Sequence, residues 1–282
     1  MSSSPLVDRL RAIPWRAVLL LSYVGTNLIL IPNTIRLGPS ISVDWQTFTA
    51  LRAAIADGTI YELHTAVPFV WSPVAAWIMA GVTMVGYWPW LAFHVLAVGL
   101  LRNWLLIGLV LVSYGFWFDA AQGNTLTFSF VAGALALGGS RPAGLVYLGL
   151  MVLAPRPILL PLAGWLLWQR PDLRIPAVVL FGVHSVVVLA TGYAVAWLVA
   201  MVTYEPLWPG VNAGPTALLG RWWLLIGIPL GAWLTWRGRV GWAGLAVSPY
   251  LTPQYLIWPL LELAPRKKPK TAPPATQPGT SE

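Results

Sequence analysis

Long apolar runs separated by short polar breaks dominate the chain from residue 17 to residue 263. The runs cover about residues 17–32, 69–87, 90–101, 104–118, 126–137, 145–153, 158–168, 175–201, 218–236 and 240–263. Many are shorter than the roughly 20 residues of a perpendicular membrane span. Several are broken by proline, and broken helices at membrane depth are tolerated only around a protein-enclosed or watery cavity. The pattern predicts an all-α polytopic membrane bundle of about nine or ten apolar segments around a recessed chamber.

A long stretch without membrane character, about residues 36–67, follows the first run. It holds a third of the nine acidic residues, namely Asp44, Asp57 and Glu62. Within it, residues 45–56 place apolar side chains at helical spacing, which is typical of an amphipathic helix on a membrane surface. The segment is expected to be a long outer loop after the first span.

Composition agrees with a membrane protein. Of the 282 residues, 57% are apolar and 9% charged, whereas soluble domains average about 45–50% and about 25%. This excludes a soluble enzyme, a disordered protein and a nucleic-acid binder. The net charge of +8 comes from basic residues between apolar runs, and such residues concentrate on cytoplasmic loops. We expect residues 1–265 to form one transmembrane domain, residues 266–282 a disordered cytoplasmic tail, and both termini to be cytoplasmic.

Few polar side chains interrupt the apolar background, and such groups are functional candidates because they are costly in a membrane unless paired. Asp44 is either a helix N-cap or a functional carboxylate. Asp119, Gln122 and Asn124 lie together, and Asp119 can cap the following helix. Arg156 stands between two prolines, where it either snorkels to the interface or meets a phosphate.

Motifs for metals and soluble-enzyme chemistry are missing from the sequence. There is no cysteine, and His64, His94 and His184 lack metal-ligand spacing. In apolar runs, histidines such as His94 and His184 usually hydrogen-bond to a neighbouring helix. No phosphate-binding loop, nucleophile elbow or HExxH motif is found. No metal site or cofactor is identified, although Asp44 with a second carboxylate is a weak candidate for a divalent metal.

An ordered set of motifs runs through the chain. It comprises Asp44, Tyr61, Phe-Val-Trp-Ser-Pro at 69–73, Gln-Gly-Asn at 122–124, Arg141, Ala-Gly at 143–144, Leu-Gly-Leu at 148–150, Pro-Arg-Pro at 155–157, and Ser-Pro-Tyr-Leu-Thr-Pro-Gln-Tyr at 248–255. Over about residues 15–262 this order resembles glycosyltransferase family 87, the mannosyltransferase-like membrane enzymes of the GT-C class. The chain departs from the family at three places. Gln-Gly-Asn replaces Gly-Gln-x-Asn, Arg156 stands near the family's Lys, and Gln254 replaces a frequent His. The chain is also shorter than the usual member of this family.

The resemblance implies a GT-C-like fold in the plasma membrane. It also implies a hexosyltransferase of the cell envelope that moves mannose or a similar sugar from a polyprenyl-phosphate donor to a lipid or glycan hydroxyl at the outer face. Asp44 would be the general base, and Arg156 would stabilise the leaving phosphate. Other donor-binding or supporting positions are Gln122, Asn124, Gln254, Asp119, His64, Tyr61 and Tyr255. The alternative is a non-catalytic membrane protein of envelope synthesis, either a lipid-carrier translocator or a scaffold.

Overall fold

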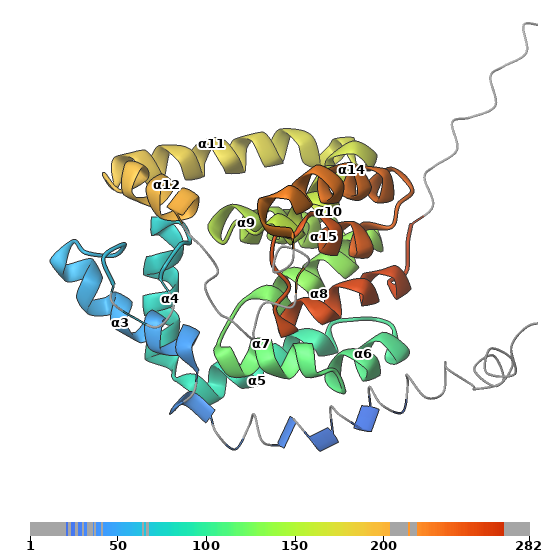
Figure 1. Cartoon of the computed structure of the whole chain (residues 1–282), viewed down its shortest axis with the longest axis horizontal. Coiled ribbons are helices and arrows are strands. Elements are labelled where there is room, and N and C mark those ends of the chain that lie inside the picture. Colours follow the sequence, from blue (N-terminus) through green and yellow to red (C-terminus); the bar gives the residue numbers. More distant parts are fainter. Residues whose placement is uncertain are drawn as a thin grey trace, which may run out of the picture.

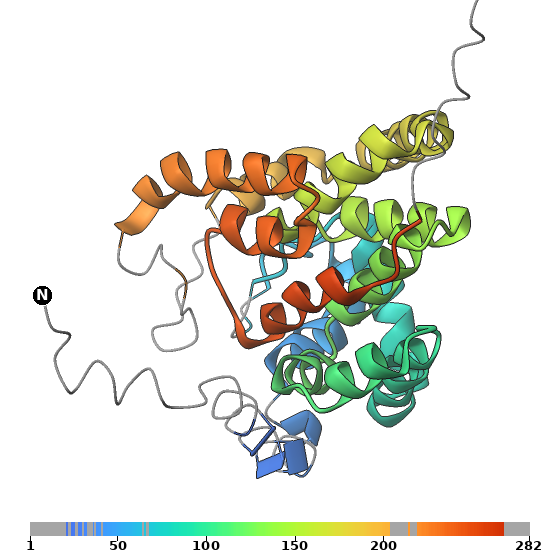
Figure 2. The same ribbon diagram turned by 90° about the vertical axis from the view of Figure 1, so that its right-hand side faces the viewer.

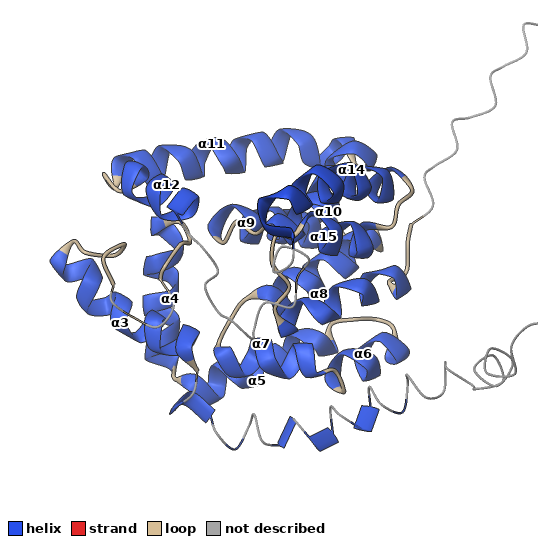
Figure 3. Ribbon diagram, viewed as in Figure 1, coloured by secondary structure: helices blue, strands red, loops and turns tan. Residues whose placement is uncertain are grey.

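The structure is a computed structural model (Figure 1) that describes most of the chain. It describes residues 21, 24–25, 28–29, 31–32, 36, 38–40, 42–63, 65, 68–203, 214 and 219–267. Every regular element among these residues is a helix (Figure 3), which confirms the all-α class. Much of the first apolar run, His64 and residues 268–282 of the expected tail lie outside the described part.

Twelve α-helices and five 3-10 helices have both ends within the described residues. The α-helices are α3 (Val43–Asp57), α4 (Pro73–Val85), α5 (Tyr87–Gly99), α6 (Trp104–Leu111), α7 (Tyr114–Gln122), α8 (Leu126–Leu137), α9 (Arg141–Leu153), α10 (Leu160–Gln169), α11 (Arg174–Ala190), α12 (Ala194–Thr203), α14 (Trp223–Trp236) and α15 (Val240–Val247). The 3-10 helices are η1 (Gly38–Ser40), η2 (Pro157–Leu159), η3 (Pro171–Leu173), η4 (Gly220–Trp222) and η5 (Pro253–Leu263).

Three of the predicted apolar runs are each two helices. The run at 104–118 breaks after α6, because the Ser113 side chain accepts the Phe116 N–H (3.1 Å) and caps α7. The run at 175–201 breaks at Gly192, whose φ of +75° ends the turn after α11. The run at 240–263 breaks between α15 and η5. The apolar composition continues across each break, so composition alone does not reveal it.

Helix length supports a membrane-spanning element at one place. The stretch Pro171–Ala190 is long and apolar enough to cross a bilayer by itself. Two further pairs qualify only if each is counted as one bent span, α4 with α5 (107°) and α6 with α7 (65°). The described residues therefore contain one such helix, or up to three with the bent pairs, and helix length does not establish nine or ten spans.

Helix α8 is the centre of the bundle (Figure 1). Ten of its twelve residues are buried, as expected of a helix that is apolar on all sides. It packs against α9, α5 and η5. In the view of Figure 2, the orange-to-red part of the chain forms α14, α15 and η5, and α15 packs on both neighbours. The long helix α11 instead exposes most of its apolar side chains and buries only His184 and Val188.

Several helix turns meet at one end of the bundle. Asn103 after α5 donates from Nδ2 to the carbonyl of Leu263 (3.3 Å), and the Lys267 N–H donates to the carbonyl of Leu137 at the end of α8 (3.0 Å). The basic residues in or beside these turns are Arg102, Arg141, Arg170, Arg174, Arg237, Arg239, Arg266 and Lys267. This part of the molecule is called the basic end below.

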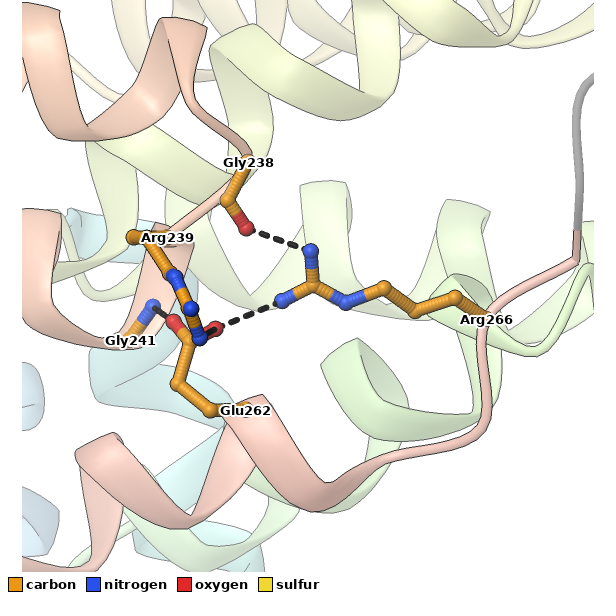
Figure 4. A network of polar contacts seen from close by, with 5 residues as sticks. All are labelled: Gly238, Arg239, Gly241, Glu262 and Arg266. Atoms are coloured by element: carbon orange, nitrogen blue, oxygen red, sulfur yellow. Dashed lines mark hydrogen bonds and ion pairs between the residues drawn. The ribbon is translucent and has the colours of Figure 1, made fainter.

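The carboxylate of Glu262 connects three segments at the basic end (Figure 4). Glu262 accepts hydrogen bonds from the Gly241 N–H (2.9 Å) and from Arg266 (2.8 Å), and pairs with Arg239 at 3.8 Å. Arg266 also donates to the carbonyl of Gly238. Arg266 and Lys267 therefore bond to the helical body.

Candidate functional site

The turn between α7 and α8 carries the Gln-Gly-Asn motif. Gly123 ends α7 in the left-handed conformation (φ +73°), which glycine adopts at no steric cost. A Cβ at Gly123 would lie 2.8 Å from the Trp45 ring, so α3 approaches the turn too closely for a larger residue. The glycine thus lets the chain reverse against α3. Gln122 and Asn124, on either side of it, both hydrogen-bond to α3.

Asn124 joins a carboxylate to a guanidinium. Its Nδ2 donates to Oδ2 of Asp44 (2.8 Å), while its Oδ1 accepts a hydrogen bond from Nη2 of Arg156. The same oxygen accepts the N–H of Thr125 (2.8 Å). These partners fix the amide orientation, because its nitrogen faces an acceptor and its oxygen faces two donors. We call the three residues Asp44, Asn124 and Arg156 the bridged triad.

Asp44 lies in the first turn of α3 and does not cap it. The N-cap is Ser42, whose hydroxyl accepts the Trp45 N–H (3.2 Å), so the capping interpretation of Asp44 is wrong. Gln122 contributes to the same helix start, because its Oε1 accepts the Val43 N–H (2.9 Å). The free N–H groups of a first helical turn favour a nearby anion. Because Ser42 and Gln122 accept N–H groups at the start of α3, the side chain of Asp44 is available to accept a hydrogen bond from Asn124.

The environment of Asp44 shifts its ionisation. Burial raises the pKa of Asp44 to about 6, and the charge of Asp119 acts in the same direction. Arg156 and the hydrogen bond from Asn124 lower the pKa and partly offset the burial. Asp44 keeps some solvent-accessible surface although protein atoms surround its carboxyl group. Such a carboxylate can accept a proton near neutral pH more readily than an ordinary aspartate.

Arg156 enters the site from the extended segment between α9 and η2. The residue is only 7% exposed, so the snorkelling interpretation is wrong. Its guanidinium carbon lies 5.0 Å from the centre of the Trp71 ring, within range of a cation–π interaction. Nη1 is buried and has no hydrogen-bond partner among the described residues. A buried cation with an unsatisfied N–H is a suitable binding group for an anion.

Asp119 supports the turn from within α7. It is fully buried, and its Oδ2 accepts the N–H of Thr127 in the first turn of α8 (2.7 Å). This is the contact expected of a residue that caps the following helix. Its Oδ1 has no partner among the described residues. Asp119 therefore acts on the bridged triad through its charge and through the position of α8.

Four predicted site residues remain, namely Gln254, Tyr255, Tyr61 and His64. Gln254 is in η5, with its buried Oε1 unpartnered among the described residues, and no hydrogen bond found there joins it to the triad. Tyr255 is buried in the core, with its ring 5.7 Å from that of Tyr250. Tyr61 donates to the carbonyl of Trp71 (2.9 Å) and so supports the ring beneath Arg156. His64 lies outside the described residues.

Sequence reasoning overlooked Trp71 as a partner of Arg156. Tryptophans in this chain are numerous and lie near the ends of apolar runs, which is typical of interfacial anchors. The pairing with Arg156 joins positions far apart in the sequence, so the pattern of the chain carries no signal for it. Among the described residues, no group of three or more His, Cys, Asp or Glu side chains could hold a metal ion.

No protein family, curated protein or solved structure matches this chain. Function therefore has to be argued from the site rather than from relatives. The site offers a carboxylate with a raised pKa, an amide hydrogen-bonded to it, and a buried cation with an N–H to spare. These groups suit a reaction in which a proton is removed on one side while negative charge develops on the other.

Proposed function

We propose that the protein is a membrane glycosyltransferase that moves a sugar from a polyprenyl-phosphate donor to a hydroxyl acceptor. The observation that carries the proposal is the bridged triad, in which Asn124 links the carboxylate of Asp44 to the guanidinium of Arg156. One amide thus separates a proton acceptor from a phosphate-binding cation. The similarity in motif order to glycosyltransferase family 87 supports the same class of donor.

The proposed step is a displacement at the anomeric carbon of the donor sugar. Asp44 takes the proton of the acceptor hydroxyl as its oxygen bonds to that carbon. The bond from the anomeric carbon to the phosphate oxygen breaks, and its electron pair leaves with the polyprenyl phosphate. The phosphate gains one negative charge, which the free Nη1 of Arg156 can stabilise. The transition state has the oxocarbenium character of other glycosyl transfers.

We propose an orientation in the membrane from the residues at the two ends of the short helices, which are basic at one end and form the bridged triad at the other. The basic end faces the cytoplasm, since Lys and Arg accumulate on that side. Helices α8 and α9 run between the basic end and the bridged triad, because α8 begins just after Asn124 and α9 ends just before Arg156. Twelve residues of α8 span about 18 Å, less than the roughly 30 Å of a hydrocarbon core. The site is then recessed below the outer surface of a multi-pass protein with cytoplasmic termini.

A recessed site also suits the proposed donor. The exposed apolar side chains of α11 face lipid in this arrangement. A polyprenyl chain can therefore stay in the hydrocarbon layer while its phosphate reaches Arg156. The acceptor, a lipid or glycan hydroxyl, approaches Asp44 from the outer side.

The test is sugar transfer by the purified protein in proteoliposomes, with polyprenyl-phosphate mannose as the first donor. Asp44→Asn should reduce turnover by at least about 100-fold, because it removes the proton acceptor and keeps the shape. The matched control is Asp57→Asn at the exposed end of the same helix, which should transfer normally. Near-normal turnover by Asp44→Asn would contradict the role of Asp44 as the base.

Arg156 is tested by donor binding. Arg156→Ala should raise the apparent KM for the donor, whereas Arg156→Lys should keep part of the affinity because the charge remains. An unchanged KM in Arg156→Ala would contradict the phosphate role. A folded wild-type protein that transfers no sugar from any polyprenyl-phosphate donor would favour a translocator or a scaffold.

A further inference from the structure

Three side chains of α5 hydrogen-bond to the turn that carries the bridged triad. The contacts are Tyr87 Oη with Ala121 O (2.8 Å), Trp90 Nε1 with Gly123 O (2.9 Å), and His94 Nε2 with Asn124 O (2.8 Å). The three α5 residues are three and four positions apart, so they share one face of the helix. We call them the α5 donor row. They meet the turn at the point where α7 ends and α8 has not begun.

The carbonyls at this turn need such donors. The last carbonyls of a helix have no N–H partner in the helix, and a buried carbonyl without a partner is costly. The turn is indeed buried, with Ala121 at 3% and Asn124 at 5% exposure. Tyr87 supplies an O–H and Trp90 an indole N–H, and the ring of His94 donates to the turn in the tautomer that is protonated at Nε2. The row therefore sets the backbone path from which Gln122 and Asn124 project.

His94 is the member of the α5 donor row that contacts a residue of the bridged triad, namely Asn124. It is fully buried, and its ring lies 5.2 Å from the Trp90 ring and 4.5 Å from that of Phe128, centre to centre. Its Nδ1 faces the carbonyl of Trp90 (2.8 Å), one turn earlier in α5, where that oxygen belongs to the hydrogen-bond ladder of the helix. Asn124 O lies outside any such ladder. A proton on Nε2 is thus what the carbonyl of Asn124 requires.

We infer that His94 is a positioning residue that acts through Asn124. Its Nε2–H holds the backbone of the residue whose side chain joins Asp44 to Arg156. Tyr87 and Trp90 hold the carbonyls of Ala121 and Gly123, so the amide of Asn124 has little freedom to turn away. The placement of His94 against Asn124 stands by itself, and its effect on sugar transfer rests on the proposed function.

The first experiment needs no activity. The chain has three histidines, so a protein labelled with 15N in its imidazole rings gives few signals, and His94→Gln identifies that of His94. We expect Nε2 of His94 to carry a proton that is engaged in a hydrogen bond across neutral pH. An unprotonated Nε2, or a ring that exchanges freely between tautomers, would overturn the inference.

The second experiment measures transfer. His94→Leu should lower kcat/KM by about 10- to 100-fold, since small misplacements of catalytic groups have effects of this size. His94→Gln should recover most of the loss, because its amide can donate to the same carbonyl. The matched control His184→Leu removes the other described buried histidine, which lies on α11 with its ring 5.8 Å from that of Trp197, and should leave kcat/KM unchanged.

The pH profile separates positioning from a general loss of stability. The hydrogen bond from Asn124 lowers the pKa of Asp44, so freeing Asn124 should move the acidic limb of the profile to higher pH in His94→Leu. An equal loss in His94→Leu and His184→Leu, or a loss with an unmoved limb, would contradict the inference. If His94→Leu does not fold, the NMR measurement on the wild-type protein tests the placement of His94 instead. A wild type without transfer activity defeats the proposed function and leaves the NMR test of His94 intact.

Discussion

The pH dependence of transfer should follow the ionisation of Asp44. Burial raises the pKa of this carboxyl from the usual 3.8 to about 6. Two pKa units correspond to about 3 kcal/mol against the charged form, and solvent at the partly exposed side chain makes this an upper value. The proposed base is the charged form, so we expect activity above the raised pKa and its loss as the pH falls through that value.

The expected profile differs clearly from that of an ordinary aspartate. A base with a pKa of about 6 is about 90% ionised at pH 7 and about 10% ionised at pH 5. The kcat/KM for the donor should therefore fall about tenfold between these values, whereas an aspartate with a pKa near 3.8 would lose only about 6% of its ionised form. The assay is initial-rate transfer in proteoliposomes at subsaturating donor between pH 4.5 and 8, which reports the ionisation of the free enzyme.

Neighbouring charges give the profile an internal check. Asp119→Asn should move the acidic limb to lower pH, because the charge of Asp119 raises the pKa of Asp44. Arg156→Ala should move it to higher pH in the activity that remains, because Arg156 lowers that pKa. A wild-type limb near pH 4, or shifts in the opposite directions, would refute the assignment of the limb to Asp44.

Three further predictions concern stability, measured by thermal unfolding in detergent. The pKa of Asp44 is about 6 in the folded protein and about 3.8 in the unfolded chain, so its ionised form destabilises the wild type at higher pH. Asp44→Asn should therefore be more stable than the wild type above pH 6 by up to about 3 kcal/mol. The gain should vanish below pH 4, where the aspartate is protonated in both states. Gly123→Ala should lose at least about 2 kcal/mol from its positive φ and its contact with α3, whereas Gly164→Ala, which meets nothing within 4 Å in α10, should lose nothing. Glu262→Gln should lose about 1–3 kcal/mol by loosening the basic end, against at most about 1 kcal/mol for the exposed Asp172→Asn. Equal losses within either pair of variants would contradict the packing described here.

The helix that could be predicted best is α8. The apolar run at 126–137 coincides with the helix, because polar turns bound it at both ends and its burial leaves no alternating pattern. The breaks at residues 112–113 and at Gly192 could not be predicted in the same way, because apolar residues continue on both sides. Tertiary packing determines where these helices end, together with the Ser113 cap at the first break and the Gly192 turn at the second.

The site was partly predictable because polar side chains stand out in an apolar chain. Asp44, Asn124 and Arg156 were conspicuous for that reason, and the structure brings them into one hydrogen-bonded chain. Their mutual contacts span 80 and 32 positions of sequence, which no local pattern encodes. Tyr87 and Trp90 were hidden for the opposite reason, because aromatic residues at the ends of apolar runs usually mark the lipid interface.

The central claim is that the bridged triad transfers sugar with Asp44 as the base. The most direct measurement is the rate of mannose transfer from polyprenyl-phosphate mannose by purified wild-type, Asp44→Asn and Asp57→Asn proteins in proteoliposomes. We predict transfer by the wild type and by Asp57→Asn, and a loss of at least about 100-fold in folded Asp44→Asn. Equal transfer by all three proteins would contradict the claim.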